Sequence, residues 1–407
     1  MWKKTIFWSV GFLLGARVLL ATLTPVFDTS EARYAAISAN MARTGNFLVP
    51  HFTHRGVYQS FDGKPPLLFQ AGGVCCRALG VSALAVRLPV LVASAVLLCL
   101  LWRVVLVLSG GDRRTAGIAT GIAASSTSFY ALAGFCMTDG LLVLCVAGAL
   151  LCHAALVQTG ERNWSLGVFA LLGLGMIVKG PVAIVEFGVG AALDVCVNRR
   201  WQVLRRYRWL AGSVLFLAIA APWFVLMARE NPGFLRYFFV NENLLRFLVH
   251  DYGDKYGSGR ETFRGMAAVW ALVVTLPWTP LWLWRIWRNR ALARPGRNPS
   301  ATAVLGWGVA GMTAFWCLTS RVPLAYLIPV VPLFAGWLAL SGTEAERRLC
   351  LRLLPAASGA SAFVLTAALA GAMLFSDKMC GSAAPYHPKR YSYEFYHGAP
   401  LGGEVVR

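Results

Sequence analysis

The sequence predicts an all-α polytopic membrane protein. Hydrophobic residues make up 57% of the 407 positions and charged residues only 14%, and the mean hydropathy is +0.59. A soluble domain of this length is not built from such a composition. The arrangement agrees, since long apolar runs alternate with short basic segments.

Eleven apolar runs are long enough to predict membrane-spanning helices. A short run such as 164–179 reaches about 24 Å at 1.5 Å per residue. The first run is longer than the apolar part of a signal peptide and no clear small-residue cleavage site ends it, so we interpret it as a retained helix. The predicted spans are 5–27, 84–108, 115–134, 138–158, 164–179, 181–198, 209–228, 265–287, 301–319, 322–341 and 351–376.

The run 67–79 is too short to span the membrane. The distribution of the basic clusters indicates whether it crosses the membrane or lies along its surface. If it lies along the membrane surface, all the basic clusters fall on one side, as the positive-inside rule requires. The N-terminus is then cytoplasmic and the polar loops face outward. The net charge of +20 is explained by these anchoring clusters, so we do not expect a nucleic-acid partner.

The chain is divided into a transmembrane domain, 1–376, and a short polar tail, 377–407. Two outer loops interrupt the transmembrane domain, at 28–80 and 229–264. A connector as long and polar as the first of these is usually functional. The tail is rich in Tyr, Gly and Pro, and we expect it to be loosely ordered.

Asp28 and Glu31 lie just after the first predicted span, where ionised groups are costly unless they are used or paired. They are therefore candidate catalytic residues. The alternative is a structural pairing of either carboxylate with Arg33. Tyr34 belongs to the same amphipathic stretch and is a further site candidate.

Two lysines are candidate phosphate-binding residues. Lys64 follows Asp62 and Gly63 and precedes two prolines that fix the turn, and a lysine there can hold a phosphate as a point charge. The alternative is a lysine that snorkels to the membrane surface. Lys179 occupies a tight break between two apolar runs and must reach water or an anion.

Asp139 begins a long apolar helix, where an acid serves equally well as a helix cap or as a catalyst. Arg246 and Arg321 are further outward-facing cations. Glu186, five residues inside its predicted helix, is interpreted as a protonated core acid or as the partner of another buried polar group.

A divalent cation is left open as a cofactor. Asp62, His250 and Glu242 carry suitable ligand atoms, but their spacing forms no recognisable ligand set.

Nine sequence pieces resemble the bacterial lipid-linked-sugar transferases of the GT-C superfamily, in particular the aminoarabinose transferase and protein O-mannosyltransferase-like group. They occur in the family's order and cover roughly residues 5 to 341. The pieces are SEARYA at 30–35, GNFLVP at 45–50, GKPPL at 63–67, RLP at 87–89, MTDGLL at 137–142, VKGPVA at 178–183, APWFVLMARENPGFLRYFFVNENLLRFL at 221–248, LPW at 276–278 and VPLAYLIPVVP at 322–332.

The resemblance implies a multi-helix bundle with surface helices after the first span. It implies an enzyme that moves a sugar from a polyprenyl phosphate to a lipid, glycan or protein acceptor at the outer face of the bacterial inner membrane. By the same resemblance Glu31 and Asp139 are functional carboxylates, and Lys64 and Tyr326 lie near the donor phosphate.

The chain departs from the family pattern in two places. Ser30 precedes Glu31 where the family often has an aspartate, and Asp62 and Gly63 precede Lys64 where the family has a glutamate. These departures leave open an inactive relative that acts in envelope assembly. A transporter or flippase of the same lipid-linked sugar is a separate alternative, which would need charged residues along a path through the bilayer.

Overall fold

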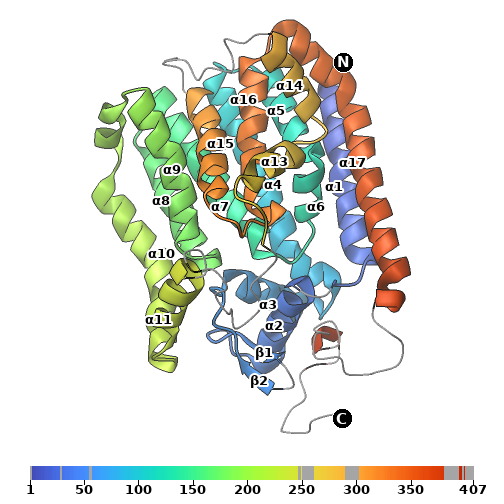
Figure 1. Cartoon of the computed structure of the whole chain (residues 1–407), viewed down its shortest axis with the longest axis vertical. Coiled ribbons are helices and arrows are strands. Elements are labelled where there is room, and N and C mark those ends of the chain that lie inside the picture. Colours follow the sequence, from blue (N-terminus) through green and yellow to red (C-terminus); the bar gives the residue numbers. More distant parts are fainter. Residues whose placement is uncertain are drawn as a thin grey trace.

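The computed structural model describes residues 2–27, 30–54, 57–245, 249, 261–288, 302–379, 394–396 and 398. Figure 1 shows a bundle of helices with a smaller group of elements gathered at its lower end. The N-terminus of α1 lies at the opposite, upper end.

The bundle consists of long helices and several shorter ones. Its members are α1 (Trp2–Leu23), α4 (Ala83–Leu108), α5 (Arg113–Ser125), α6 (Thr127–Leu132), α7 (Thr138–Thr159), α8 (Asn163–Val178), α9 (Val182–Val197), α10 (Trp209–Glu230), α13 (Met266–Val274), α14 (Thr279–Arg288), α15 (Thr302–Cys317), α16 (Val330–Ser341) and α17 (Glu344–Met379), with the 3-10 turns η1 (Trp201–Arg206) and η4 (Leu324–Leu327).

The membrane-spanning character is confirmed, but the count of eleven spans is not. In the described part of the chain six helices are long and apolar enough to cross a bilayer, or seven if α13 and α14 form one broken span. These two helices are bent by 108° at a break that contains Pro277. The predicted span 115–134 is likewise divided between α5 and α6. Apolar composition alone does not reveal such breaks, because both halves of a broken helix are equally apolar.

The elements at the lower end come mostly from the first polar loop. They are the helix α2 (Ser30–Thr44), an antiparallel hairpin of β1 (His51–His54) and β2 (Val57–Ser60), and the helix α3 (Leu67–Leu79). The expectation that 67–79 does not span agrees with the 13-residue length of α3 and its place beside α2 (Figure 1). The hairpin is a feature that the sequence did not predict.

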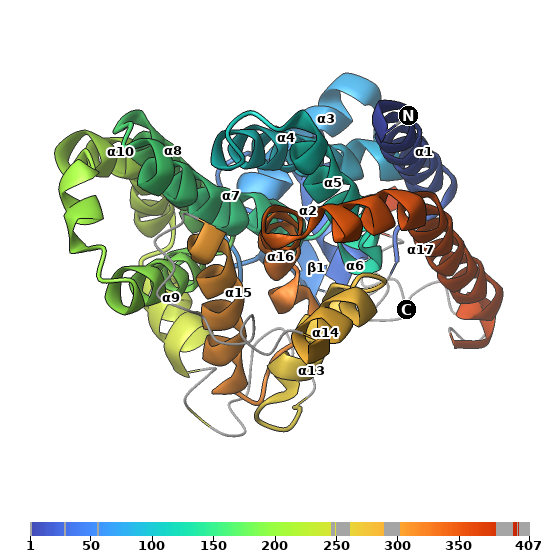
Figure 2. The ribbon, with the colours of Figure 1, turned by 90° about the horizontal axis from the view of Figure 1, so that it is seen from above.

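Helix α7 lies in the middle of the bundle when the bundle is seen from above (Figure 2). In the most apolar 18-residue stretch of α7, 89% of the residues are buried inside the protein, whereas in the corresponding stretch of α1 only 28% are buried. Helix α7 packs mainly against α4 and α8. The helix therefore carries polar side chains at its two ends, Asp139 and His153, into protein rather than lipid.

One short piece of the tail is packed, against the expectation of loose order. Residues 394–396 form a single helical turn, and the side chain of Phe395 is fully buried. The Glu394 carboxylate accepts hydrogen bonds from the Thr53 backbone N–H and from the Asn40 side chain, at 2.7–3.0 Å. These contacts hold this turn against α2 and β1.

Candidate functional site

Glu31 lies in the first turn of α2 and forms an ion pair with Arg87 of α4. Its Oε1 accepts from Arg87 Nε at 2.8 Å and its Oε2 accepts from Arg87 Nη2 at 3.0 Å. The backbone N–H groups of Cys136 and Phe27 also donate to this carboxylate, each at 3.0 Å. The alternative of a Glu31–Arg33 pair is wrong, since Arg87 pairs with Glu31 and the Arg33 guanidinium lies over the rings of Tyr34 and Phe61; Asp28, the other carboxylate offered for Arg33, lies outside the described residues.

Arg87 is completely buried, and its remaining N–H groups donate hydrogen bonds to backbone carbonyls just before α2. Its Nη1 donates to the carbonyls of Ala21 and Thr24, and its Nη2 donates to the carbonyl of Pro25. A bidentate arginine–carboxylate pair with these added bonds is strong and geometrically specific. The pair therefore fixes the junction of α1, α2, α4 and the segment before α7.

Asp139 does not act as the cap of α7, because the N-cap position is Met137 and no side-chain cap bond forms there. The Asp139 carboxylate instead accepts a hydrogen bond of 2.7 Å from Lys179 Nζ. Both side chains are more than 90% buried. The same ammonium group lies 3.8 Å from the ring centroid of Tyr326, a close cation–π contact.

Glu186 joins this group through aromatic side chains. The Nε1–H of Trp316 donates to Glu186 Oε1 at 2.9 Å, and the Trp316 and Tyr326 rings are 4.6 Å apart. Glu186 is fully buried. The sequence expectation of a partner to another buried polar group is confirmed, and the partner is Trp316.

Lys64 forms the second lysine–carboxylate pair, with Nζ 2.5 Å from Glu242 Oε1. The lysine side chain is only 14% exposed, so it does not snorkel to the surface. Glu242 lies in the π-helix η2 (Tyr237–Leu245), which continues the short helix α11 (Phe234–Arg236). Asp62, two residues before Lys64, accepts from Ser60 and from Asn231 at the end of α10.

Gly180 connects the two lysine pairs. It adopts a φ of +89°, which favours glycine, and a Cβ at this position would lie 2.5 Å from the Phe238 ring and 3.7 Å from Asn243 Nδ2. The break after Lys179 is therefore pressed against η2, next to Glu242. The Lys179–Asp139–Tyr326 group and the Lys64–Glu242 pair thus lie on two segments that pack together through Gly180, and the five residues are here called the lysine cluster.

Other sequence candidates fall outside this cluster or outside the described residues. Arg321 pairs with Glu261 at 2.8 Å, and Tyr34 packs against Phe61 and Phe69. Asp28, Arg246 and His250 lie outside the described residues. Among the residues that the structure does describe, no group of three or more His, Cys, Asp or Glu side chains is placed to hold a metal ion.

Comparison with known proteins bears on the fold of the chain. Residues 64–226 match the family model of dolichyl-phosphate-mannose-protein mannosyltransferases. The solved structure of ArnT from Cupriavidus metallidurans bound to undecaprenyl phosphate superposes with a TM-score of 0.70 at 21% identity, covering 97% of this chain and 69% of that one. The chain has the fold of this ArnT structure. The resemblance predicted from the sequence is thereby confirmed at the level of fold.

Curated relatives extend the similarity in sequence. Undecaprenyl phosphate-alpha-4-amino-4-deoxy-L-arabinose arabinosyl transferase of Erwinia tasmaniensis is 26% identical over 79% of this chain and 56% of the relative. The protein of the same name from Aeromonas salmonicida is 26% identical over 84% of this chain and 60% of the relative. An oligosaccharyltransferase of Archaeoglobus fulgidus matches in structure with a TM-score of 0.55 at 13% identity, over 91% of this chain and 56% of that one. The chain thus spans less than two thirds of the length of these curated relatives.

Sequence reasoning did not single out Arg87 or Trp316 as members of the polar networks. The sequence could have identified Arg87, because an arginine within a long apolar helix must have buried partners. Trp316 had none, because one tryptophan in an apolar run is an ordinary membrane-helix residue.

Proposed function

We propose that this chain is a membrane glycosyltransferase that takes a sugar from a polyprenyl-phosphate donor and passes it to an acceptor. The observation that carries the proposal is the lysine cluster, in which two largely buried lysines, each paired with a carboxylate, lie on segments that pack together through Gly180 and η2. A lysine ammonium is a compact point charge that suits a phosphate. The named functions of the curated relatives support the same donor class.

In the proposed reaction the donor phosphate replaces one carboxylate beside each lysine. Lys64 and Lys179 then neutralise the phosphate as the bond between it and the sugar carbon breaks. The acceptor attacks that carbon from the opposite side, with inversion, and a carboxylate takes its proton. Because a phosphate is a good leaving group, positioning and charge neutralisation supply most of the rate enhancement.

Asp139 is our first choice for the proton acceptor, because donor binding to Lys179 would free its carboxylate. Glu242 stands in the same relation to Lys64 and is the second choice. Glu31 keeps four hydrogen bonds, so we assign it a positioning role. A catalytic role for Glu31 or Asp28 stays a prediction from the sequence.

We place this site at the outer face of the bacterial inner membrane, with the N-terminus cytoplasmic. The positive-inside rule supports this orientation, since the basic clusters fall on the side of α1's N-terminus. A pentose is the sugar class that the names of the relatives favour, and a lipid, glycan or protein remains the acceptor class.

Mass spectrometry of envelope lipids, glycans and proteins tests the proposal. Cells with the wild-type chain should contain one species heavier by a single sugar than cells that lack the chain or carry Asp139→Asn. If no fraction changes mass while purified chain translocates the lipid-linked sugar across proteoliposomes, the transporter alternative replaces the transferase.

A further inference from the structure

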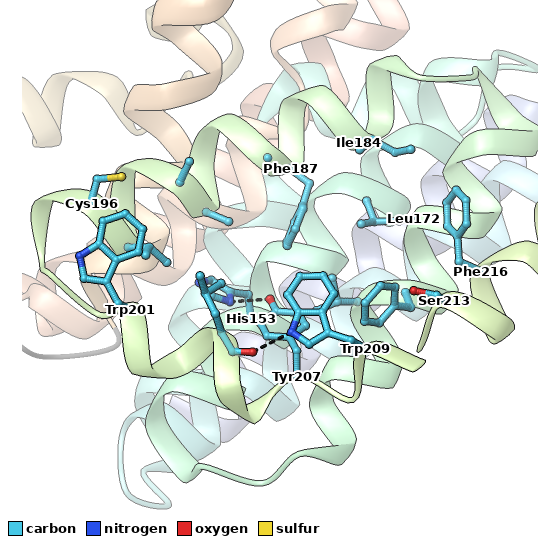
Figure 3. Close-up of a pocket in the computed structure, with 17 residues that line it drawn as sticks. His153, Leu172, Ile184, Phe187, Cys196, Trp201, Tyr207, Trp209, Ser213 and Phe216 are labelled. Carbon is cyan, nitrogen blue, oxygen red and sulfur yellow. Dashed lines mark hydrogen bonds between the residues drawn. The ribbon is translucent and has the colours of Figure 1, made fainter. Parts of the chain in front are cut away.

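A second site candidate is an apolar cavity of about 480 Å³ between α8, α9 and α10 (Figure 3). Its size falls within the range of ordinary small-molecule sites, about 300–1,000 Å³. The wall is built almost entirely of aliphatic and aromatic side chains, among them Leu172, Ile184, Phe187, Trp201, Trp209 and Phe216. An apolar ligand is therefore the only kind that fits its interior.

The lining of the cavity extends along α9 from Ile184, near the lysine cluster, to Cys196 at the opposite end of the bundle, where the polar and exposed lining residues gather. His153 lines the cavity, and the rise of an α-helix places His153 about 21 Å along α7 from Asp139. In Figure 1 the upper parts of α8 and α9, near the cavity, lie at the same end as the N-terminus of α1. The cavity is thus a site separate from the proposed donor site.

One wall of the cavity is fixed by buried polar groups. His153 Nδ1 lies 2.8 Å from the Tyr207 hydroxyl, the contact drawn in Figure 3. Asp194 is 3.8 Å from His153 Nε2 and also holds Arg200 and Asn198. This network links α7 and α9 to the segment before α10 and so fixes the wall of the cavity that contains His153 and Tyr207.

The rim of the cavity is cationic and aromatic. Trp201 and Trp209, both lining residues, are 57% and 54% exposed, and exposed tryptophans are typical of the membrane–water interface. Exposed arginines alternate with the lining residues along the chain, and such clusters attract anionic lipid headgroups. These arginines are Arg199, Arg205, Arg206 and Arg208.

We propose that this cavity binds one acyl chain of an anionic diacyl phospholipid from the adjacent leaflet, with its phosphate against the arginine rim. The apolar interior matches an acyl chain and the rim matches a negative headgroup. A polyprenyl phosphate that placed its phosphate at this rim would hold it away from the lysine cluster, so it is the less suitable occupant of the rim. The bound lipid would hold α10 against α8 and α9.

Gly188 offers a way to close the cavity. It lines the cavity, and a Cβ built on it meets no atom within 4 Å. Gly188→Phe should therefore fill the space without a backbone shift. Gly359 of α17 is a matched control, because its Cβ also meets nothing within 4 Å and the residue is exposed on another face.

The test is native mass spectrometry of the full chain after delipidation. Dioleoyl phosphatidylglycerol, dioleoyl phosphatidylcholine and undecaprenyl phosphate are added in parallel. Wild type and Gly359→Phe should retain phosphatidylglycerol in preference to phosphatidylcholine, and Gly188→Phe should lose that preference. Arg205→Gln should weaken phosphatidylglycerol binding about fivefold, and Arg208→Gln by a similar factor.

Three outcomes would overturn the proposal. The first is equal retention of phosphatidylglycerol and phosphatidylcholine by wild type. The second is a Gly188→Phe chain that binds phosphatidylglycerol as Gly359→Phe does. The third is displacement of phosphatidylglycerol by undecaprenyl phosphate at equal concentration. If Gly188→Phe does not fold, the two arginine variants decide, and unchanged phosphatidylglycerol binding in both contradicts the proposal.

Discussion

Two buried ion pairs of this protein differ in how their atoms are used. The Arg87–Glu31 pair is bidentate, and Arg87 is wholly buried with further bonds to three backbone carbonyls. The Lys179–Asp139 pair has one hydrogen bond, at 2.7 Å, and the ammonium also faces the Tyr326 ring. The arginine pair joins helix ends, whereas the lysine pair lies at a helix break beside a second lysine–carboxylate pair. We infer that the first is architectural and the second exchanges its partner for a ligand.

The largest expected effect is on stability, at Arg87. Arg87→Ala leaves the Glu31 carboxylate buried without its cation, which should lower the free energy of unfolding by about 3–5 kcal/mol. The control is Arg114→Ala, which removes a solvent-screened pair with the exposed Glu344 and should change the free energy of unfolding far less than Arg87→Ala does. Denaturation of both variants in the same detergent measures the difference. Equal losses would remove the architectural role of Arg87.

The next effect separates the two carboxylates by activity. Asp139→Asn should reduce sugar transfer about a hundredfold or more, the usual contribution of a general base. Glu31→Gln should lower the melting temperature and reduce transfer only as far as folded protein is lost. Single-turnover assays normalised to folded protein compare them. Normal transfer by folded Asp139→Asn, with none by folded Glu31→Gln, would reverse our assignment of the two residues.

The smallest effect concerns the docked tail turn at residues 394–396. Burial raises the pKa of the Glu394 carboxyl above its usual value, although hydrogen bonds from Thr53 and Asn40 oppose the shift. The docked state therefore binds the proton more tightly than the free tail does. Docking should be strongest below the ordinary glutamate pKa of about 4.3 and should weaken as the pH rises through the raised value.

Hydrogen exchange at the Thr53 amide, corrected for its intrinsic pH dependence, checks this prediction. Protection should fall between pH 4 and pH 8 in wild type and stay level in Glu394→Gln. Protection that rises with pH in wild type would show that the carboxylate form is the one that docks.

The sequence predicted the fold class and much of the candidate site, for reasons that particular residues make clear. Lys64, Lys179 and Asp139 stood out because charged groups at the ends of apolar runs need partners or ligands. The surface helices at 30–44 and 67–79 followed from their amphipathic character and length. These signals are local, so a single sequence contains them.

The partners could not be predicted, because they depend on contacts between distant parts of the chain. Glu31 and Arg87 are 56 residues apart, and Lys64 and Glu242 are 178 apart. The sequence offered Arg33 as an alternative partner of Glu31 or Asp28, because it is a cation close to both along the chain. Packing of α4 against α1 and α2 brings Arg87 within hydrogen-bonding distance of Glu31. No local sequence pattern predicts that packing.

Donor binding tests the central claim, that the lysine cluster holds the donor phosphate, most directly. Undecaprenyl phosphate is titrated into wild type, Lys64→Ala and Lys64→Arg in nanodiscs, with Lys3→Ala as a control at an exposed lysine of the opposite end. Lys64→Ala should lose about 1.5–3 kcal/mol, roughly ten- to a hundredfold in affinity, and Lys64→Arg should recover part of it. Lys3→Ala should bind as wild type does. An unchanged affinity in folded Lys64→Ala would contradict the claim.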